Sequence, residues 1–100
     1  MNTLKIKVPQ KELSEFCLQH HIRKLAFFGS VLRDDFTSES DIDVLVEFEP
    51  GFTPGLAFFD LQDELSKMLE HKVDLNTPGF ISSYFREQVN REARVQYVQA

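Results

Sequence analysis

Two aspartates stand at the entrance to an apolar run in this 100-residue sequence, in the segment Ser40-Asp41-Ile42-Asp43-Val44. Side chains two residues apart on a strand point to the same side, so the carboxylates of Asp41 and Asp43 are expected to project together. Two like charges this close repel one another unless a cation lies between them. Carboxylate oxygens suit Mg²⁺, which takes one or two carboxylates together with water and substrate phosphates. The pair therefore predicts a magnesium site, although an aspartate after a serine is also ordinary turn chemistry.

A third carboxylate follows the same pattern later in the chain. Asp74 lies between Val73 and Leu75, so its side chain is expected to point away from the apolar face of a short strand. If that strand lies beside Ile42–Phe48, three carboxylates converge on one solvent-facing patch. Such a patch is typical of two-metal sites for phosphoryl or nucleotidyl transfer. A solvated strand face would also explain Asp74 taken by itself.

A Gly-Ser pair upstream favours the metal hypothesis. Gly29 and Ser30 interrupt an apolar run, and glycine permits both a tight turn and a close approach of the backbone to a phosphate. If Ser30 begins a helical turn, its N–H and its hydroxyl can both face an anion. Arg33 could add a phosphate contact, or could equally pair with one of the two aspartates that follow it.

The elements that must position these residues follow from the spacing of apolar side chains. We predict helices after Pro9, over Leu56–Leu69 and around Ile81, Tyr84, Phe85 and Val89, and strands over Leu25–Phe28, Ile42–Phe48 and Lys72–Leu75. The segment Val95–Val98 is compatible with either an edge strand or a helical tail. This order predicts an α/β (α+β) domain over residues 1–100, with a small mixed sheet and helices packed on one face.

Composition narrows the classes of function. The formal net charge is −5 and no basic face is visible, so we do not expect direct nucleic-acid binding. No apolar run approaches the roughly 20 residues of a membrane span, and the N-terminus has no secretory signal. The single cysteine, Cys17, excludes an internal disulfide, and its helical spacing favours core packing. A cytoplasmic location is the simplest expectation.

The motifs "FFGS" at residues 27–30, "SDIDVLVEF" at 40–48 and "KVDL" at 72–75 resemble the signature of the nucleotidyltransferase superfamily that includes DNA polymerase beta. More narrowly, they resemble the minimal nucleotidyltransferase (MNT, MntA-type) proteins, which are often antitoxin partners of HEPN-domain toxins. The resemblance implies a polymerase-beta-like nucleotidyltransferase fold. The loop departs slightly from the family, because Asp34 and Asp35 stand where small residues are common.

The resemblance also implies a role for each matching residue. Gly29 and Ser30 would hold the phosphates of ATP, with Arg33 as a further contact. Asp41 and Asp43 would bind Mg²⁺. Asp74 would complete one metal site and help to deprotonate the acceptor hydroxyl.

The function that the resemblance implies is transfer of AMP from ATP to a hydroxyl, for which a tyrosine is expected, of a partner HEPN-type toxin. The chain would then act as a type VII-like antitoxin. Its length leaves no room for an acceptor-binding domain, which also favours a protein acceptor. An alternative is a non-catalytic antitoxin that neutralises its partner by binding alone.

Overall fold

The computed structural model describes residues 6–32, 36–37, 39–52, 54–77, 87 and 91–99. Its elements, in chain order, are α1 (Gln10–Gln19), β1 (Ile22–Phe28), the short 3₁₀ turn η1 (Gly29–Leu32), β2 (Ile42–Phe48), α2 (Ala57–Leu69), β3 (Val73–Asn76) and β4 (Arg94–Val98). The strands form one sheet in the order β3-β2-β1-β4. β1 is antiparallel to both β2 and β4, whereas β2 and β3 are parallel, so the predicted mixed sheet is confirmed.

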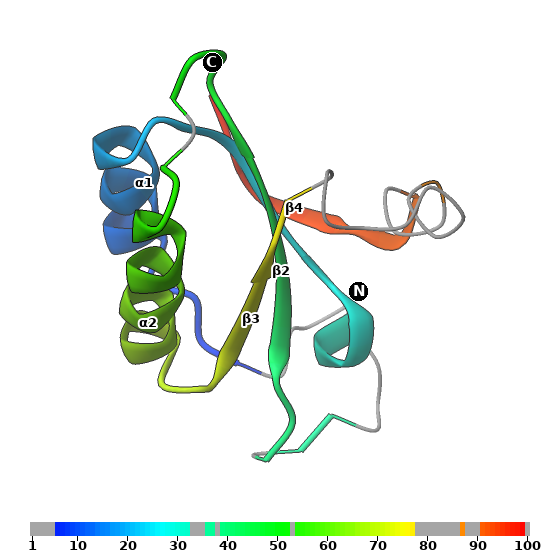
Figure 1. The fold of residues 1–100 in the computed structure, drawn as a ribbon. Coiled ribbons are helices and arrows are strands. Elements are labelled where there is room, and N and C mark those ends of the chain that lie inside the picture. Colours follow the sequence, from blue (N-terminus) through cyan, green and yellow to red (C-terminus); the bar gives the residue numbers. More distant parts are fainter. Residues whose placement is uncertain are drawn as a thin grey trace.

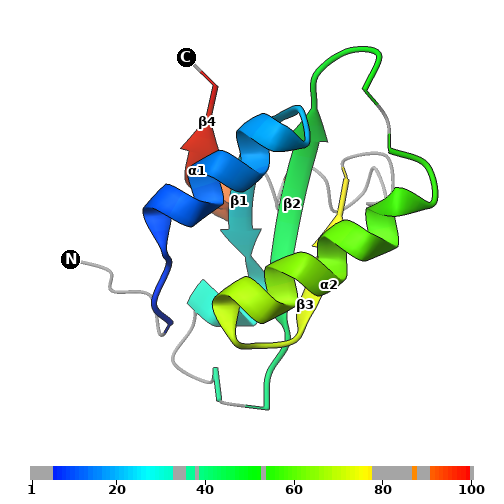
Figure 2. The ribbon, with the colours of Figure 1, turned by 90° about the vertical axis from the view of Figure 1, so that its left-hand side faces the viewer.

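Both α-helices cover the same face of this sheet (Figures 1 and 2). The core between the two layers is built from the apolar positions that the periodicity indicated: Leu13, Phe16 and Cys17 of α1, Ile42, Val44 and Val46 of β2, and Phe58, Leu61, Leu65 and Leu69 of α2. Met68, which was expected on the same face of α2, packs only partly buried at the edge of that core. Neither described helix is long and apolar enough to cross a membrane.

The parallel neighbours β2 and β3 are joined through α2, as a parallel strand pair requires a crossover. The polar side of α2 holds β3 in place at its outer edge. The backbone N–H of Val73 donates to Ser66 Oγ at 3.0 Å, and that of Leu75 donates to Gln62 Oε1 at 2.9 Å. These two bonds satisfy donors that would otherwise be open at a sheet edge.

Several predicted boundaries shift. β1 begins at Ile22, three residues before the predicted start. The segment around Val95 is the edge strand β4, so the helical-tail alternative is wrong. The predicted turn at Pro78 and the residues predicted to mark a last helix, Ile81, Tyr84, Phe85 and Val89, lie outside the described residues.

Cys17 belongs to the core, as expected. It is fully buried between α1 and the sheet. Burial raises the pKa of its thiol to about 12, because the thiolate would lose its hydration. The thiol therefore stays neutral near pH 7 and serves packing.

Candidate active site

The register of β2 and β3 places two of the three predicted carboxylates side by side. Asp43 pairs with Asp74, flanked by the pairs Ile42 with Val73 and Val44 with Leu75. Paired residues on neighbouring strands share a face, and the strands lie about 4.8 Å apart. Because the flanking pairs point into the helix-covered core, Asp43 and Asp74 point to the opposite face.

Asp41 precedes β2 by one residue and is exposed, as is Asp74, whereas Asp43 is half-buried. The turn before Asp41 is closed by hydrogen bonds between Thr37 and Ser40. Thr37 N–H donates to Ser40 Oγ at 3.0 Å, and Ser40 N–H donates to the carbonyl oxygen of Thr37 at 3.0 Å. This turn fixes the direction from which the chain enters β2.

The carboxylates do not form a closed cage. Within the described ranges, no three side chains of His, Cys, Asp or Glu are grouped closely enough to hold a metal ion by themselves. Magnesium seldom needs such a cage, since it usually keeps waters and is bound by one or two carboxylates plus substrate phosphates. An open pair of hard oxygen donors on adjacent strands is compatible with that chemistry.

Gly29 lies directly against the Asp43 carboxylate. A Cβ atom at residue 29 would stand 3.1 Å from Asp43 Cγ and closer still to Oδ2. The backbone of Gly29 also has φ +78°, in the left-handed region that side-chain-bearing residues avoid. Close packing and backbone conformation therefore both require glycine, and the backbone at residue 29 lies directly against the carboxylate.

The structure places the other phosphate-binding candidates only in part. Ser30 follows Gly29 inside η1, so the predicted helical turn is present in its backbone. The side chain of Ser30 and the whole of Arg33 lie outside what the structure describes, together with Asp34 and Asp35. Their predicted roles remain predictions.

The sequence had led us to expect that the face carrying the carboxylates is open to solvent. In the structure, part of that face is buried. Leu45 and its β1 neighbour Ala26 point away from the helices, yet they are only 3% and 1% exposed. The site is therefore confined to the end of β2 that carries Asp41 and Asp43. Further along the strand the same face is covered.

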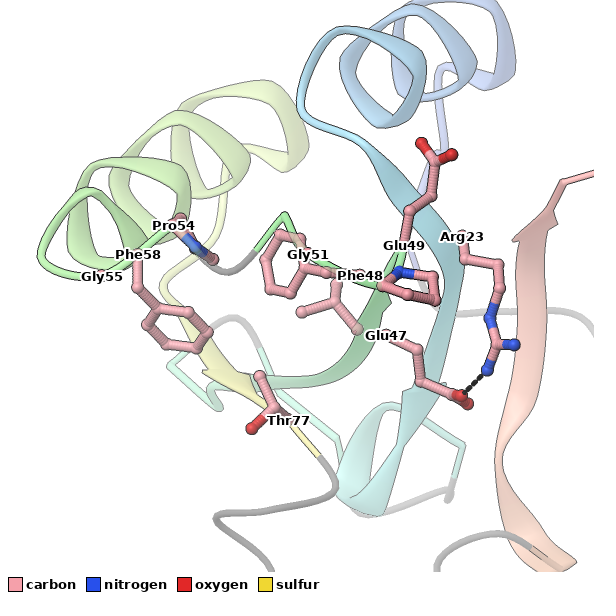
Figure 3. A pocket seen from close by; sticks show the side chains of 11 residues that line it. Arg23, Glu47, Phe48, Glu49, Gly51, Pro54, Gly55, Phe58 and Thr77 are labelled. Atoms are coloured by element: carbon pink, nitrogen blue, oxygen red, sulfur yellow. Dashed lines mark hydrogen bonds and ion pairs between the residues drawn. The ribbon is translucent and has the colours of Figure 1, made fainter.

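A cavity of about 470 Å³ lies at the other end of β2, between the end of that strand, the start of α2 and Thr77 (Figure 3). Phe58 points into it from α2, and the ion pair of Arg23 with Glu47 closes one side. None of the predicted site residues lines this cavity. It lies at the end of β2 opposite Asp41 and Asp43.

Sequence reasoning missed two residues, one beside the Asp43 carboxylate and one beside Gly29. Phe28 pairs with Asp43 across β1 and β2, so it flanks the carboxylate opposite Asp74. Arg94, at the start of β4, lines a smaller cavity together with Gly29. The motif "FFGS" contained the signal for Phe28, but nothing local in the sequence connects Arg94 with Gly29.

Comparison with known proteins agrees with the fold. The family model for the nucleotidyltransferase domain matches residues 10–97. A protein of Methanocaldococcus jannaschii provisionally named a protein adenylyltransferase is 41% identical over 76 residues, covering 74% of this chain and 76% of the relative. The protein adenylyltransferase MntA of Thermococcus cleftensis is 34% identical over 83 residues, covering 83% and 80%.

Solved structures show the same architecture. A structure provisionally named a minimal nucleotidyltransferase has a TM-score of 0.70 at 34% identity, covering 84% of this chain and 85% of the other. The complex of a tri-AMPylated HEPN toxin of Shewanella oneidensis with its MNT antitoxin has a TM-score of 0.59 at 20% identity, covering 90% and 70%, and bears on the fold alone. With these matches and its signature residues in place, the chain belongs to the nucleotidyltransferase domain family, in its minimal, MntA-type branch.

Proposed function

We propose that this protein is a Mg²⁺-dependent adenylyltransferase that transfers AMP from ATP to a hydroxyl of a HEPN-type partner protein and thereby silences it. The observation that carries the proposal is the pairing of Asp43 with Asp74 beside Gly29, in a chain of the nucleotidyltransferase family. Relatives named as protein adenylyltransferases support a protein as the acceptor.

Asp41 and Asp43 would hold the metal, with Asp74 as the third carboxylate. The donor set fits in kind, because all three are hard oxygen ligands and the strand pairing sets Asp43 beside Asp74. When bound, Mg²⁺ neutralises the charge of the triphosphate and of the reacting phosphoryl group. The rigid sheet keeps the carboxylates in place without reorganisation during the reaction.

The remaining residues act on substrate and acceptor. The backbone of Gly29, which carries no side chain to obstruct an approach, would lie along the phosphates with Ser30. Asp74 would accept the proton of the attacking hydroxyl, which then attacks the α-phosphorus in line with the departing pyrophosphate. For the acceptor we expect a tyrosine hydroxyl.

The alternative, a non-catalytic antitoxin that acts by binding, predicts a different stoichiometry. We expect a trace of this protein, with ATP and Mg²⁺, to modify a molar excess of its HEPN-type partner, because an enzyme turns over. Intact-mass spectrometry of the partner should show a gain of one or a few adenylyl groups, together with loss of toxic activity. Protection that occurs only mole for mole, without a mass change, would establish the binding mechanism instead.

Binding of Mg²⁺ together with ATP should also increase the thermal stability of the protein. ATP with Mg²⁺ is expected to raise the melting temperature, because a ligand that binds only the folded state stabilises it, by about 2.7 kcal/mol at 100 times its Kd. ATP with excess EDTA should raise it much less, because the carboxylate pair then repels the triphosphate. Differential scanning fluorimetry makes the comparison. An equal shift with and without Mg²⁺ would contradict the metal assignment.

A further inference from the structure

Three large apolar side chains stand exposed between the end of β2 and the first turn of α2. Phe52 is 46% exposed, Leu56 86% and Phe59 62%. Single apolar residues on a surface are ordinary, but a group of them marks a binding surface far more often. The connector between β2 and α2 projects beyond the end of the sheet (Figure 2). We call these three residues the connector patch.

The cavity of about 470 Å³ at the end of β2 adjoins the connector patch (Figure 3). Each residue of the patch directly follows a cavity-lining residue in the chain, namely Gly51, Gly55 and Phe58. Leu56 and Phe59 share a helical face, and the N–H of Phe59 donates to the carbonyl oxygen of Leu56 at 3.3 Å. The apolar surface therefore combines a concavity with exposed side chains at its border.

Contacts with the turn between α1 and β1 hold the connector in place. The ring of His21 stacks on Phe52 with centroids 3.9 Å apart, and the His21 carbonyl oxygen accepts the N–H of Glu49 at 2.8 Å. His21 Nδ1 lies 3.4 Å from Glu49 Oε2. To make these contacts His21 takes φ 57°, in the left-handed region that costs a side-chain-bearing residue energy. A surface that is ordered beforehand loses less conformational entropy when a partner covers it.

Charge defines the kind of partner that this surface fits. Residues 34–66 contain no lysine or arginine, and their acidic residues extend from the candidate metal site to Glu49 at the cavity and Asp60 in the first turn of α2. Arg23 of β1 also lines the cavity, but Glu47 pairs with it and offsets its charge. Interfaces match opposite charges and place aromatic or aliphatic anchors at their centre. The surface therefore fits a partner that carries lysine or arginine around an apolar anchor.

We propose that the connector patch and the adjoining cavity form a docking surface for the HEPN-type partner, which contributes an apolar anchor surrounded by basic residues. The inference rests on the proposed function, since it requires that partner. β2 has 7 residues, so the cavity lies about 20 Å from the carboxylates, less than the roughly 30 Å width of a small domain. A partner docked here can place its acceptor hydroxyl at the carboxylates, and the docking surface adds to contacts at the rim of the site.

A second copy of this chain is the competing occupant of the patch. Two copies would bring the same acidic stretch face to face, and like charges across an interface oppose association. If the patch nevertheless joins two copies, the free protein sediments as a dimer, and Phe59→Gln converts it to a monomer without a change in affinity for the partner. That result would overturn the proposal.

Calorimetric titration with the HEPN-type partner tests the docking surface. We expect Leu56→Gln with Phe59→Gln to weaken binding by at least about 30-fold, the size typical of lost anchors at the centre of an interface. Val98→Gln is the matched control, because Val98 is 63% exposed but lies on the edge strand β4, two strands away from β2. It should bind within about twofold of wild type. Melting temperature and ATP affinity should stay at the wild-type values in both variants.

Transfer kinetics separate docking from catalysis. Loss of docking should raise KM for the partner and leave kcat at saturating partner unchanged, because the substituted side chains are remote from the metal ligands. Raising the salt concentration from about 50 to about 300 mM should weaken wild-type binding, since salt screens the attraction between a basic partner surface and an acidic one.

The possible failures can be told apart. If wild type binds the partner and the double variant binds it equally well, the docking surface is wrong and the proposed function stands. If wild type neither binds nor modifies the partner, the proposed function fails and the inference falls with it. Binding that salt does not weaken would overturn the basic character of the partner's surface. Should the double variant prove unfolded, Leu56→Gln alone decides, and wild-type affinity of that variant would overturn the proposal.

Discussion

Replacing Asp41 and Asp43 together by asparagine is expected to lower the rate of adenylyl transfer by at least about 100-fold. Neutral amides hold Mg²⁺ weakly compared with carboxylates. The metal contributes several kcal/mol of charge stabilisation in the transition state, and each 1.36 kcal/mol is about tenfold in rate. The measurement is the rate at which the HEPN-type partner gains adenylyl mass under a trace of each variant.

Net charge must be separated from metal binding in this experiment. Glu15→Gln with Asp63→Asn makes the same change of two charges at exposed positions on the helices, across the sheet from the carboxylates. That control should transfer at the wild-type rate. The asparagine variant should still bind the partner, because we expect docking on the rim around the site and not on the metal ligands. If it transfers as fast as wild type, Asp41 and Asp43 do not hold the catalytic metal.

The carboxylate face was predictable because its signals are local. Strict alternation of Ile42, Val44 and Val46 with polar or outward-facing neighbours fixed both the strand and its two faces, and β2 has the predicted bounds. The outward direction of Asp74 was predicted from the same alternation on a shorter strand. The sequence did not establish that β2 and β3 are neighbours; the convergence of the carboxylates was predicted only if they were. The two strands are parallel neighbours, and α2, which the apolar spacing predicted clearly, provides the crossover between them.

Features that depend on distant pairing were not predictable. The bulged pairing of β1 with β4 is needed to place Arg94 near Gly29, and no local pattern contains it. Burial does not alternate strictly along β4, because Val95 and Val98 are exposed whereas Gln96 and Tyr97 are both half-buried. The apolar spacing of this segment therefore did not exclude a helical tail. The need for glycine at residue 29 was predicted from turn chemistry, but its contact with Asp43 appears only once β1 and β2 lie side by side.

Val44→Asp is expected to unfold the protein. Val44 is 0% exposed and packs in the core beneath the two helices, where the described core residues are all apolar. The substitution loses the burial of a valine side chain, about 1.5–3 kcal/mol, and adds a penalty of several kcal/mol for an unpaired buried charge. Together these approach the whole stability of a small domain, about 5–15 kcal/mol. Circular dichroism at 25 °C should show loss of helix and sheet signal.

Asp43→Ala, one residue away on the opposite face, provides the matched comparison. Asp43 stands beside Asp74 across β2 and β3, so removing its charge lowers the like-charge density on this face, and the half-buried position leaves no large cavity. We expect this variant to stay folded, with a change in unfolding free energy within about 1 kcal/mol, and to lose transfer activity. The two variants distinguish a structural residue from a site residue, because Val44→Asp should lose the fold whereas Asp43→Ala should keep the fold and lose activity. An unfolded Asp43→Ala beside a folded Val44→Asp would mean that the faces of β2 are assigned the wrong way round.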